Sequence, residues 1–308
     1  MAVGDYALHA VKGLKESFDN AMSKKILEYK DSRLFTFETT TEFDEKFTST
    51  EALSGSKKLS ESETPPTLKL DEGYAVTLSD ERFGGAVEVN EKMRVEAKDS
   101  TTKIDTFIMR QRNQLLVDNY NLLLVNIHKM FNEAFSSSSD YLAPDGVEIC
   151  GTHSWNTSGA STWSNATTDA LDMSAVDAAK AVGGAFTDAK GRPMPIDYDT
   201  IIVKKGGAAS REAKKLFGST ITPAVVANVN IYEGEMTIIE TPYITETNHW
   251  FMMDSKLANP LYVGINEMPQ MREPIKQNNE AVRSNVTGFW KQGVNNLPFN
   301  LYGSDGTT

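Results

Sequence analysis

A long apolar stripe in the middle of this 308-residue chain constrains its fold more than any other feature. Between residues 104 and 135 the apolar side chains recur with the spacing of one helix face, and no Gly or Pro interrupts them. At 1.5 Å per residue the predicted helix is roughly 50 Å long, whereas a compact globule of this size has a radius of gyration of about 19 Å. The sequence therefore predicts an elongated molecule. The stripe comprises Ile104, Ile108, Leu115, Leu116, Tyr120, Leu123, Ile127, Met130, Phe131 and Phe135.

A second amphipathic helix is predicted between Asp5 and Tyr29, at the start of the chain. Its apolar residues again fall at steps of three or four, which places them on one face. We expect that face to pack against a partner. The residues are Leu8, Val11, Leu14, Phe18, Met22 and Ile26.

The region after this helix is polar and extended. Residues 39–67 contain 12 Ser or Thr among 29 residues and include Pro65 and Pro66. Residues 74–98 then alternate between apolar and polar side chains, which predicts two long strands joined near Asp80 to Gly85. We interpret residues 43–98 as a long, thin hairpin. Because a two-stranded ribbon is only marginally stable in water, this one needs another surface to lie on.

The rest of the chain alternates short strands and helices, which is typical of an α+β domain. Ser174 and Asp177 form a capping-box pattern before an Ala-rich helix that ends at Gly183–Gly184. A strand is expected at residues 199–203, followed by a helix capped near Ser210 that ends at Gly218. Further strands are expected at residues 236–240, 250–253, 261–265 and 285–292.

Composition excludes several functional classes. The single Cys150 rules out an internal disulfide framework and any multi-cysteine metal site. A net charge of -11 argues against a protein whose whole surface binds nucleic acid, because that affinity comes from Lys and Arg. No apolar run reaches the length of a membrane-spanning helix.

Signals for catalysis or metal binding are weak. Cys150 and His153 could share a metal and Asp197 and Asp199 a cation, but a polar loop and a strand start explain these residues better. Residues 204–211 resemble a phosphate-binding turn but lack the residue order of a P-loop. We therefore expect no catalytic residue, no cofactor and no metal.

Several short motifs occur in an order that is similar to one known family. They are Trp163-Ser-Asn, the Ala-rich helix from Ser174, Gly191-Arg-Pro-Met, Thr200-Ile-Ile-Val, Thr241-Pro-Tyr-Ile-Thr and Trp250-Phe-Met-Met. In this order, and with the long helix before them, the chain resembles the major capsid proteins of tailed bacteriophages, in particular the Mu-like major head subunits. That fold is shared with encapsulins and with the herpesvirus capsid floor. The similarity in element order covers nearly the whole chain, and the motifs cover about a third.

The resemblance implies a division of the chain into the parts of a capsid subunit. Residues 1–42 would form an N-terminal arm, and residues 43–100 an extended β-hairpin loop that reaches over an adjacent subunit. Residues 101–165 would form the long spine helix and peripheral domain, and residues 166–265 the axial domain. Residues 266–308 would return to the peripheral domain.

The function implied is structural and not enzymatic. Subunits would self-assemble into hexamers and pentamers of an icosahedral head that encloses double-stranded DNA without sequence-specific binding, and a procapsid would then mature. The resemblance implies a separate scaffolding protein, a portal, no membrane, and possibly a decoration protein, with assembly in the host bacterial cytoplasm and a final place in the virion capsid. No partner asparagine marks Lys57, Lys58 or Lys69 for cross-linking between subunits, so we expect non-covalent closure.

Two alternatives stay open: an encapsulin-like nanocompartment shell and a cytosolic α+β enzyme. If the chain is a shell subunit, contacts between subunits are expected from side chains of the arm, the extended loop, the peripheral domain and the axial domain. The candidates are Phe18, Lys57, Lys58, Arg82, Phe83, Trp163, Lys204 and Lys205.

Overall fold

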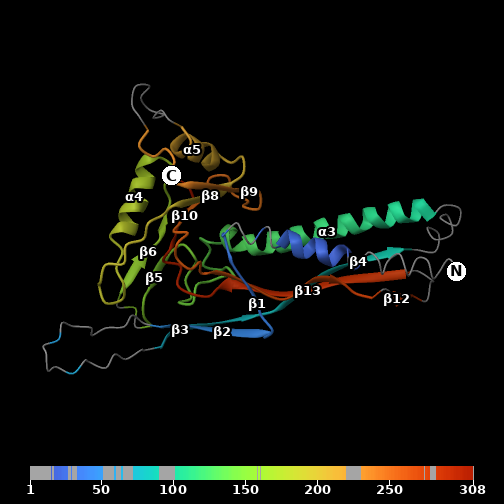
Figure 1. Ribbon diagram of the computed structural model, residues 1–308. Helices are drawn as coiled ribbons and strands as arrows, with labels where there is room; N and C mark the ends of the chain where they lie inside the picture. Colours follow the sequence, from blue (N-terminus) through green and yellow to red (C-terminus); the bar gives the residue numbers. More distant parts are fainter. Residues whose placement is uncertain are drawn as a thin grey trace. The chain divides into compact units, whose positions relative to one another are not determined.

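The computed structural model describes most of the chain. The described residues are 15, 17–26, 29, 33–50, 59, 64, 72–89, 101–157, 159, 161–219, 230–273, 275–277 and 282–307. The chain forms two compact units that each combine distant segments, as Figure 1 shows by colour. Unit 1 comprises Met1–Glu45, Leu78–Ile127 and Val263–Gln292, and unit 2 comprises Lys46–Thr77, His128–Tyr262 and Gly293–Thr308.

The sheet of unit 1 is built around one long strand. β13 (Val282–Val294) lies between β4 (Glu81–Val89) on one side and β11 (Leu261–Met271) with the short β12 (Ile275–Lys276) on the other, and β1 (Thr36–Thr39) completes the sheet beyond β11. β4 and β13 are antiparallel, with Trp290 opposite Glu81 and Val282 opposite Val89. β4 has no second partner strand among the described residues, so it forms an edge of this sheet.

The long helix predicted from the apolar stripe is present as α3 (Thr101–Asn132). Its buried face carries the predicted residues Leu115, Leu116, Leu123, Ile127 and Met130. Within unit 1 the helix lies along β4, close enough that a Cβ on Gly85 would come within 3.4 Å of Leu115. One face of the edge strand is therefore covered by α3.

The N-terminal helix is also confirmed where the chain is described, at residues 17–26. Phe18, Met22 and Ile26 are spaced four residues apart and are buried, as the periodicity predicted. Their burial corrects the expectation that this face packs against a partner, because these three residues are already buried within their own chain. Leu8, Val11 and Leu14 lie outside the described residues.

The predicted pairing of two strands within residues 74–98 is wrong. β3 (Glu72–Ser79) pairs with β2 (Asp44–Thr50) in a two-stranded ribbon, and β4 pairs with β13. The physical reason is the apolar side of β4. Its side chains are buried by packing on the long strand β13, whereas a polar hairpin would bury less of them. The ring of Phe83 stacks on Trp290 with the centroids 3.8 Å apart.

Unit 2 is an α+β layer with a five-stranded sheet in the order β7-β14-β10-β8-β9. The strands are β7 (Ala166–Thr167), β8 (Thr200–Lys204), β9 (Thr237–Thr241), β10 (Trp250–Met253) and β14 (Leu301–Ser304). The helices α4 (Met173–Gly184) and α5 (Ala208–Phe217) contribute Val176, Ala179, Ala213 and Leu216 to its core. A small sheet of β5 (Thr152–Ser154) and β6 (Thr162–Ser164) also belongs to this unit.

Two helix starts differ from the sequence prediction. α4 is capped by Asp172, whose carboxylate accepts a hydrogen bond from the backbone N–H of Ala175, and not by Ser174. α5 begins after Gly207 without a side-chain cap, while Ser210 donates a hydrogen bond to Glu240. In both cases a residue two or three positions earlier already had the extended backbone that a helix cap requires.

The end of the chain also differs. Residues 266–308 were expected to return together as one last strand region, and β13 supplies a long strand as expected. Leu301–Ser304 instead form β14, which pairs with β10 in the sheet of unit 2. Leu301 and Tyr302 are buried there, and this apolar burial explains why the segment joins that sheet.

Candidate assembly surfaces

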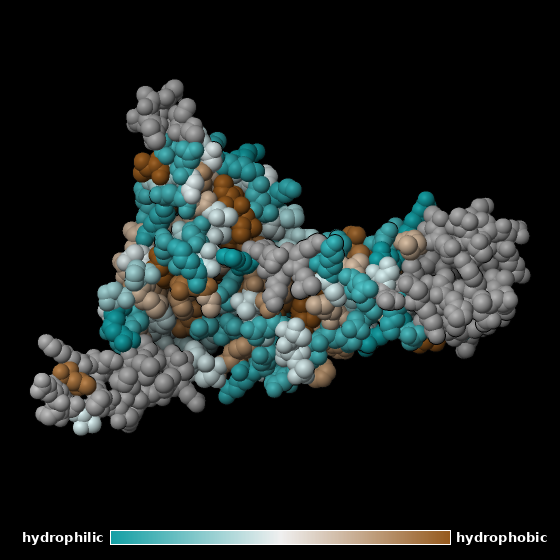
Figure 2. Space-filling model, viewed as in Figure 1, coloured by the Kyte–Doolittle hydropathy of each residue, from teal (hydrophilic) through white to brown (hydrophobic). Residues whose placement is uncertain are grey.

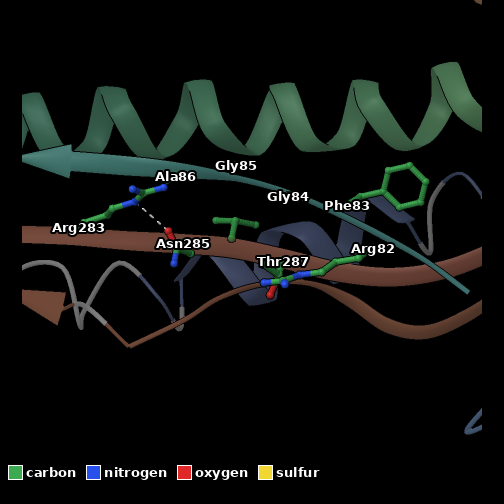
Figure 3. A pocket seen from close by; sticks show the side chains of 9 residues that line it. Arg82, Phe83, Gly84, Gly85, Ala86, Arg283, Asn285 and Thr287 are labelled. Atoms are coloured by element: carbon green, nitrogen blue, oxygen red, sulfur yellow. Dashed lines mark hydrogen bonds between the residues drawn. The ribbon is translucent and has the colours of Figure 1, made fainter. Parts of the chain in front are cut away.

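One face of β4 and β13 in unit 1, the face that points away from α3, is open to solvent at Arg82, Gly84 and Ala86. Side chains of a strand alternate between its two faces, so Phe83 and Gly85 lie toward α3, while Arg82, Gly84 and Ala86 lie on the opposite face. Because glycine and alanine add almost no bulk, this face is hollowed into an open groove of about 370 Å³ (Figure 3).

Two arginines lie at opposite ends of this groove, and polar side chains of β13 form its floor. Arg283 donates a hydrogen bond from Nε to Asn285 Oδ1 over 3.1 Å, and Glu88 lies opposite it in the ladder. Arg82 is exposed and lies opposite Phe289. Arginine side chains at such positions suit carboxylates, which they bind through paired N–H donors. The groove could therefore receive an acidic segment, of which a chain with net charge -11 has many.

The β2–β3 ribbon is the least buried sheet of the chain. Among its described side chains none is fully buried, and Lys46, Thr48, Ala75 and Thr77 are exposed along one face. On the opposite face, two aromatic residues hold the ribbon in unit 2. The first is Phe47 of β2, whose ring centroid lies 4.8 Å from that of Tyr262. The second is Tyr74, whose hydroxyl donates to the carbonyl of Asn156 over 2.6 Å. The ribbon is thus held on one side and open on the other.

Trp163 belongs to an aromatic cluster within unit 2. Its ring centroid lies 4.6 Å from His153, 5.6 Å from Trp155 and 5.2 Å from Phe186. Trp163 is half-buried, so part of its ring is still accessible. The neighbouring Trp155 donates a hydrogen bond from its indole N–H to the carbonyl of Thr187.

Lys204 is the last residue of β8, Lys205 follows it directly, and the two lysines differ in their contacts. Lys204 is half-buried and donates a hydrogen bond from Nζ to the carbonyl of Thr245. The side chain of Lys205 is exposed, while its backbone N–H is held by the carbonyl of Thr241 at 2.9 Å. A fixed backbone with a free charged side chain suits a surface contact.

The remaining predicted contact residues fall elsewhere. Phe18 is fully buried within its own chain, so its ring has no surface to offer a neighbour. Lys57 and Lys58 lie outside the described residues. The structure thus brings Arg82 and Phe83 together on neighbouring positions of one strand, and the other described candidates lie apart from them.

Exposed apolar side chains accompany these surfaces. In unit 1, Phe43 and Ile275 are each 63% exposed, and Met109, Val117 and Val125 are about half exposed along α3. In unit 2, Ile231 is 74% exposed. Figure 2 shows brown patches of this kind among teal polar residues. Single exposed apolar side chains are common on protein surfaces, so they do not by themselves mark a contact.

The titratable groups singled out from the sequence are engaged in structural contacts. His153 is fully buried, with Nδ1 at 3.0 Å from Asp145 Oδ2 and Nε2 at 3.2 Å from the carbonyl oxygen of Ile149. Burial raises the pKa of Asp145, but the hydrogen bond and charge of His153 outweigh it and hold that pKa below its usual value. Burial also raises the pKa of the Cys150 thiol, which keeps it protonated.

Within the described part of the chain, no group of three or more His, Cys, Asp or Glu side chains is placed to hold a metal ion. Within the same residues, no helix combines the length and apolarity needed to cross a bilayer.

One buried cluster escaped the sequence analysis. Lys291 of β13 is fully buried, and its Nζ lies 3.5 Å from Glu45 Oε2 and 3.6 Å from Asp80 Oδ1. The three residues are far apart in the sequence, and a lysine in an alternating strand pattern is ordinarily exposed. No local signal could have found this cluster.

Comparisons with known proteins give a fold but no family. Neither a family model nor a curated protein matches the sequence. Solved structures do match. A chain from Microbacterium phage Oxtober96 is 13% identical, with 88% of both chains covered and a TM-score of 0.50. The crystal structure of a virus-like particle from Pyrococcus furiosus is 10% identical, with 95% of this chain and 98% of that chain covered and a TM-score of 0.50.

The fold is that of a capsid shell protein. It is the α+β fold of tailed-phage major capsid proteins, as the element order of the sequence indicated. At identities of 13% and 10% the likeness concerns the fold alone, and the roles of individual side chains follow from the geometry described above.

Proposed function

We propose that this chain is the major capsid subunit of a tailed bacteriophage head. The observation that carries the proposal is the similarity of fold over 88% of the chain to a phage protein and over 95% of it to a virus-like particle. Subunits would self-assemble into hexamers and pentamers of an icosahedral shell around double-stranded DNA. The Mu-like branch of these proteins, suggested by the sequence motifs, is part of this proposal.

The surfaces of the chain support a role in assembly. An edge strand and a ribbon with one open face are features that an isolated soluble protein protects against unwanted pairing. A closed symmetric assembly covers such surfaces with other subunits. We propose Arg82, Phe83, Trp163, Lys204 and Lys205 as contact residues between subunits; Lys57 and Lys58 stay predictions.

Domain roles and partners extend the same proposal. Residues 1–42 would act as the arm, 43–100 as the extended loop, 101–165 as spine and peripheral domain, 166–265 as axial domain and 266–308 as the return. Partners would be further copies of the chain, a scaffolding protein, a portal and a decoration protein. The net charge of -11 would keep packaged DNA mobile, because like charges repel.

A shell that encloses something other than a genome is the second candidate. It is favoured by the match to the virus-like particle, which covers more of both chains than the phage match does. Both candidates predict a closed shell, and they differ in its contents.

Electron microscopy of the purified full-length protein tests both candidates. Shells tens of nanometres across are expected, and a monodisperse monomer would contradict both. Nuclease-protected DNA inside particles from infected or induced cells would support the phage head. Particles filled with a second protein and free of DNA would support the nanocompartment.

A further inference from the structure

The buried cluster of Lys291, Asp80 and Glu45 lies within unit 1, where Asp80 separates β3 from β4 and Lys291 belongs to the long strand β13. The ladder pairs Trp290 with Glu81, so the same register places Lys291 directly opposite Asp80. Directly opposite residues have Cβ atoms about 5 Å apart with side chains on the same face. The register therefore places the two side chains next to each other, and in the structure Lys291 Nζ lies 3.6 Å from Asp80 Oδ1.

The surroundings of the pair exclude water. The side chains of Lys291 and Asp80 are 0% and 1% exposed, and that of Glu45 is 23% exposed. Phe43 packs edge-on against Phe289 with centroids 6.1 Å apart, beside this junction. The backbone N–H of Asp80 donates to the carbonyl of Phe43 over 2.8 Å, which fixes the aspartate at its place.

Hydrogen bonding orients the amine and leaves the aspartate unsatisfied. Lys291 Nζ donates to the carbonyl of Glu42 over 2.5 Å, while neither carboxylate oxygen of Asp80 has a hydrogen-bond partner in the described structure. A buried carboxylate without hydrogen bonds is strongly unfavourable. Passing one proton from Lys291 to Asp80 would remove both buried charges and leave an amine next to a carboxylic acid.

We propose that Lys291 and Asp80 join in an isopeptide bond within one chain, with Glu45 as the proton carrier. The neutral amine attacks Cγ of the protonated Asp80 carboxyl, and Glu45 takes a proton from the nitrogen. Glu45 then returns that proton to the leaving hydroxyl, so one C–N bond forms, one C–O bond breaks and one water departs. The reaction needs no oxidant, reductant or cofactor.

Such a bond has a clear structural consequence. It removes two buried charges at once and ties the junction of β3 and β4 covalently to β13. It lies within one subunit, so it differs from cross-linking between subunits and leaves the monomer mass on a denaturing gel. The inference concerns a single chain and holds whether or not the chain builds a phage head.

Mass spectrometry of the denatured full-length protein tests the proposal directly. The wild-type chain is expected to weigh one water less than its sequence, and peptide mapping should return a branched peptide that joins Lys291 to Asp80. A wild-type chain with its full sequence mass, after incubation in the folded state, would overturn the proposal. A joined peptide that uses another lysine would overturn it as well.

Variants distinguish formation of this bond from a loss of water elsewhere in the chain. Lys291→Met and Asp80→Ala should restore the full mass, whereas Lys215→Met, which removes an exposed lysine of α5, should still lose one water. Asp80→Asn should give the same branched product by loss of ammonia. Glu45→Gln should slow the loss of water while circular dichroism shows a folded chain, and unchanged kinetics in that folded variant would refute the role of Glu45.

Discussion

In the sheet of unit 2 the two central strands are buried on both faces, whereas β4 at the edge of the unit 1 sheet exposes one face along most of its length. Ile201, Ile202, Trp250, Phe251 and Met252 all have no exposed surface. Arg82, Gly84 and Ala86 of β4 are exposed. A sheet covered on both faces is complete as the core of a single chain. An open sheet face remains available, and in a shell protein it is the natural place for another subunit.

The largest effect is expected from Phe251→Ala in the covered sheet. The Phe251 ring is fully buried between Phe131 and Phe135, with centroids 5.1 and 5.6 Å away. Removing it leaves a cavity, so the free energy of unfolding should fall by about 3–5 kcal/mol in a denaturant titration. Val182→Ala on the exposed side of α4 is the control and should change it by about 0.5 kcal/mol or less. Equal losses in the two variants would refute the contrast between buried and exposed apolar residues.

An intermediate effect is expected from Gly84→Ala in the open sheet. A Cβ at Gly84 would lie 2.2 Å from the carbonyl oxygen of Val286, so β4 and β13 would have to move apart. Overpacking of this kind should cost about 1–3 kcal/mol of unfolding free energy. The neighbouring Gly85→Ala is the matched control, since its Cβ would meet Leu115 only at 3.4 Å. If Gly85→Ala were the more damaging variant, the assignment of the two faces of β4 would be wrong.

A smaller effect on stability, but a clear one on assembly, is expected from Arg82→Glu. The side chain is exposed, so the unfolding free energy should change by about 0.5 kcal/mol or less. The groove would lose one of its two arginines, and the yield of shells counted by electron microscopy should drop. Arg82→Lys should retain part of the yield because it keeps the charge. The control Lys215→Glu makes the same charge change on α5 and should leave the yield unchanged; a similar drop there would mean that net charge alone matters.

The sequence predicted those helices and strands whose buried residues form a recognisable apolar pattern within the element. α3 and the N-terminal helix could be predicted because a helix that buries one face repeats apolar residues every three or four positions. The strand at Trp250–Met253 was found because it is a short run of large apolar residues. In each of these cases the evidence for the element lies within the element itself.

Pairings between distant segments could not be predicted in the same way. Alternation showed that residues 74–98 form strands, but it carries no information on the partner, and the pairing of β4 with β13 joins residues about two hundred positions apart. Periodicity also showed that Phe18, Met22 and Ile26 share a face without showing which chain buries it. The burial of Lys291 depends on Glu45 and Asp80, and only the folded chain brings these residues together. Among the contact candidates, Arg82 and Lys205 are exposed as a contact requires, while Phe18 is not.

The smallest expected effect concerns pH and the covered sheet of unit 2. His249 packs edge-on against Phe135 with centroids 5.1 Å apart. Burial lowers the pKa of His249 below its usual 6.5, and the charges of Glu246 and Asp305 only partly offset this. The folded chain therefore takes up this proton at lower pH than the unfolded chain does. Its contribution to stability is complete above pH 6.5 and is lost as the pH falls from 6.5 through the lowered pKa.

His249→Gln removes this titration and tests its sign. Between about pH 8 and about pH 5 the melting temperature of the wild-type chain should fall more than that of the variant, because only the wild type must exclude a proton from His249. Curves that stay parallel across this range would show that burial does not perturb His249. A wild-type chain that became relatively more stable at low pH would instead mean that the charges of Glu246 and Asp305 outweigh burial at His249. The surroundings of His249 at this edge of the sheet would then be more exposed to solvent than the fully buried strands.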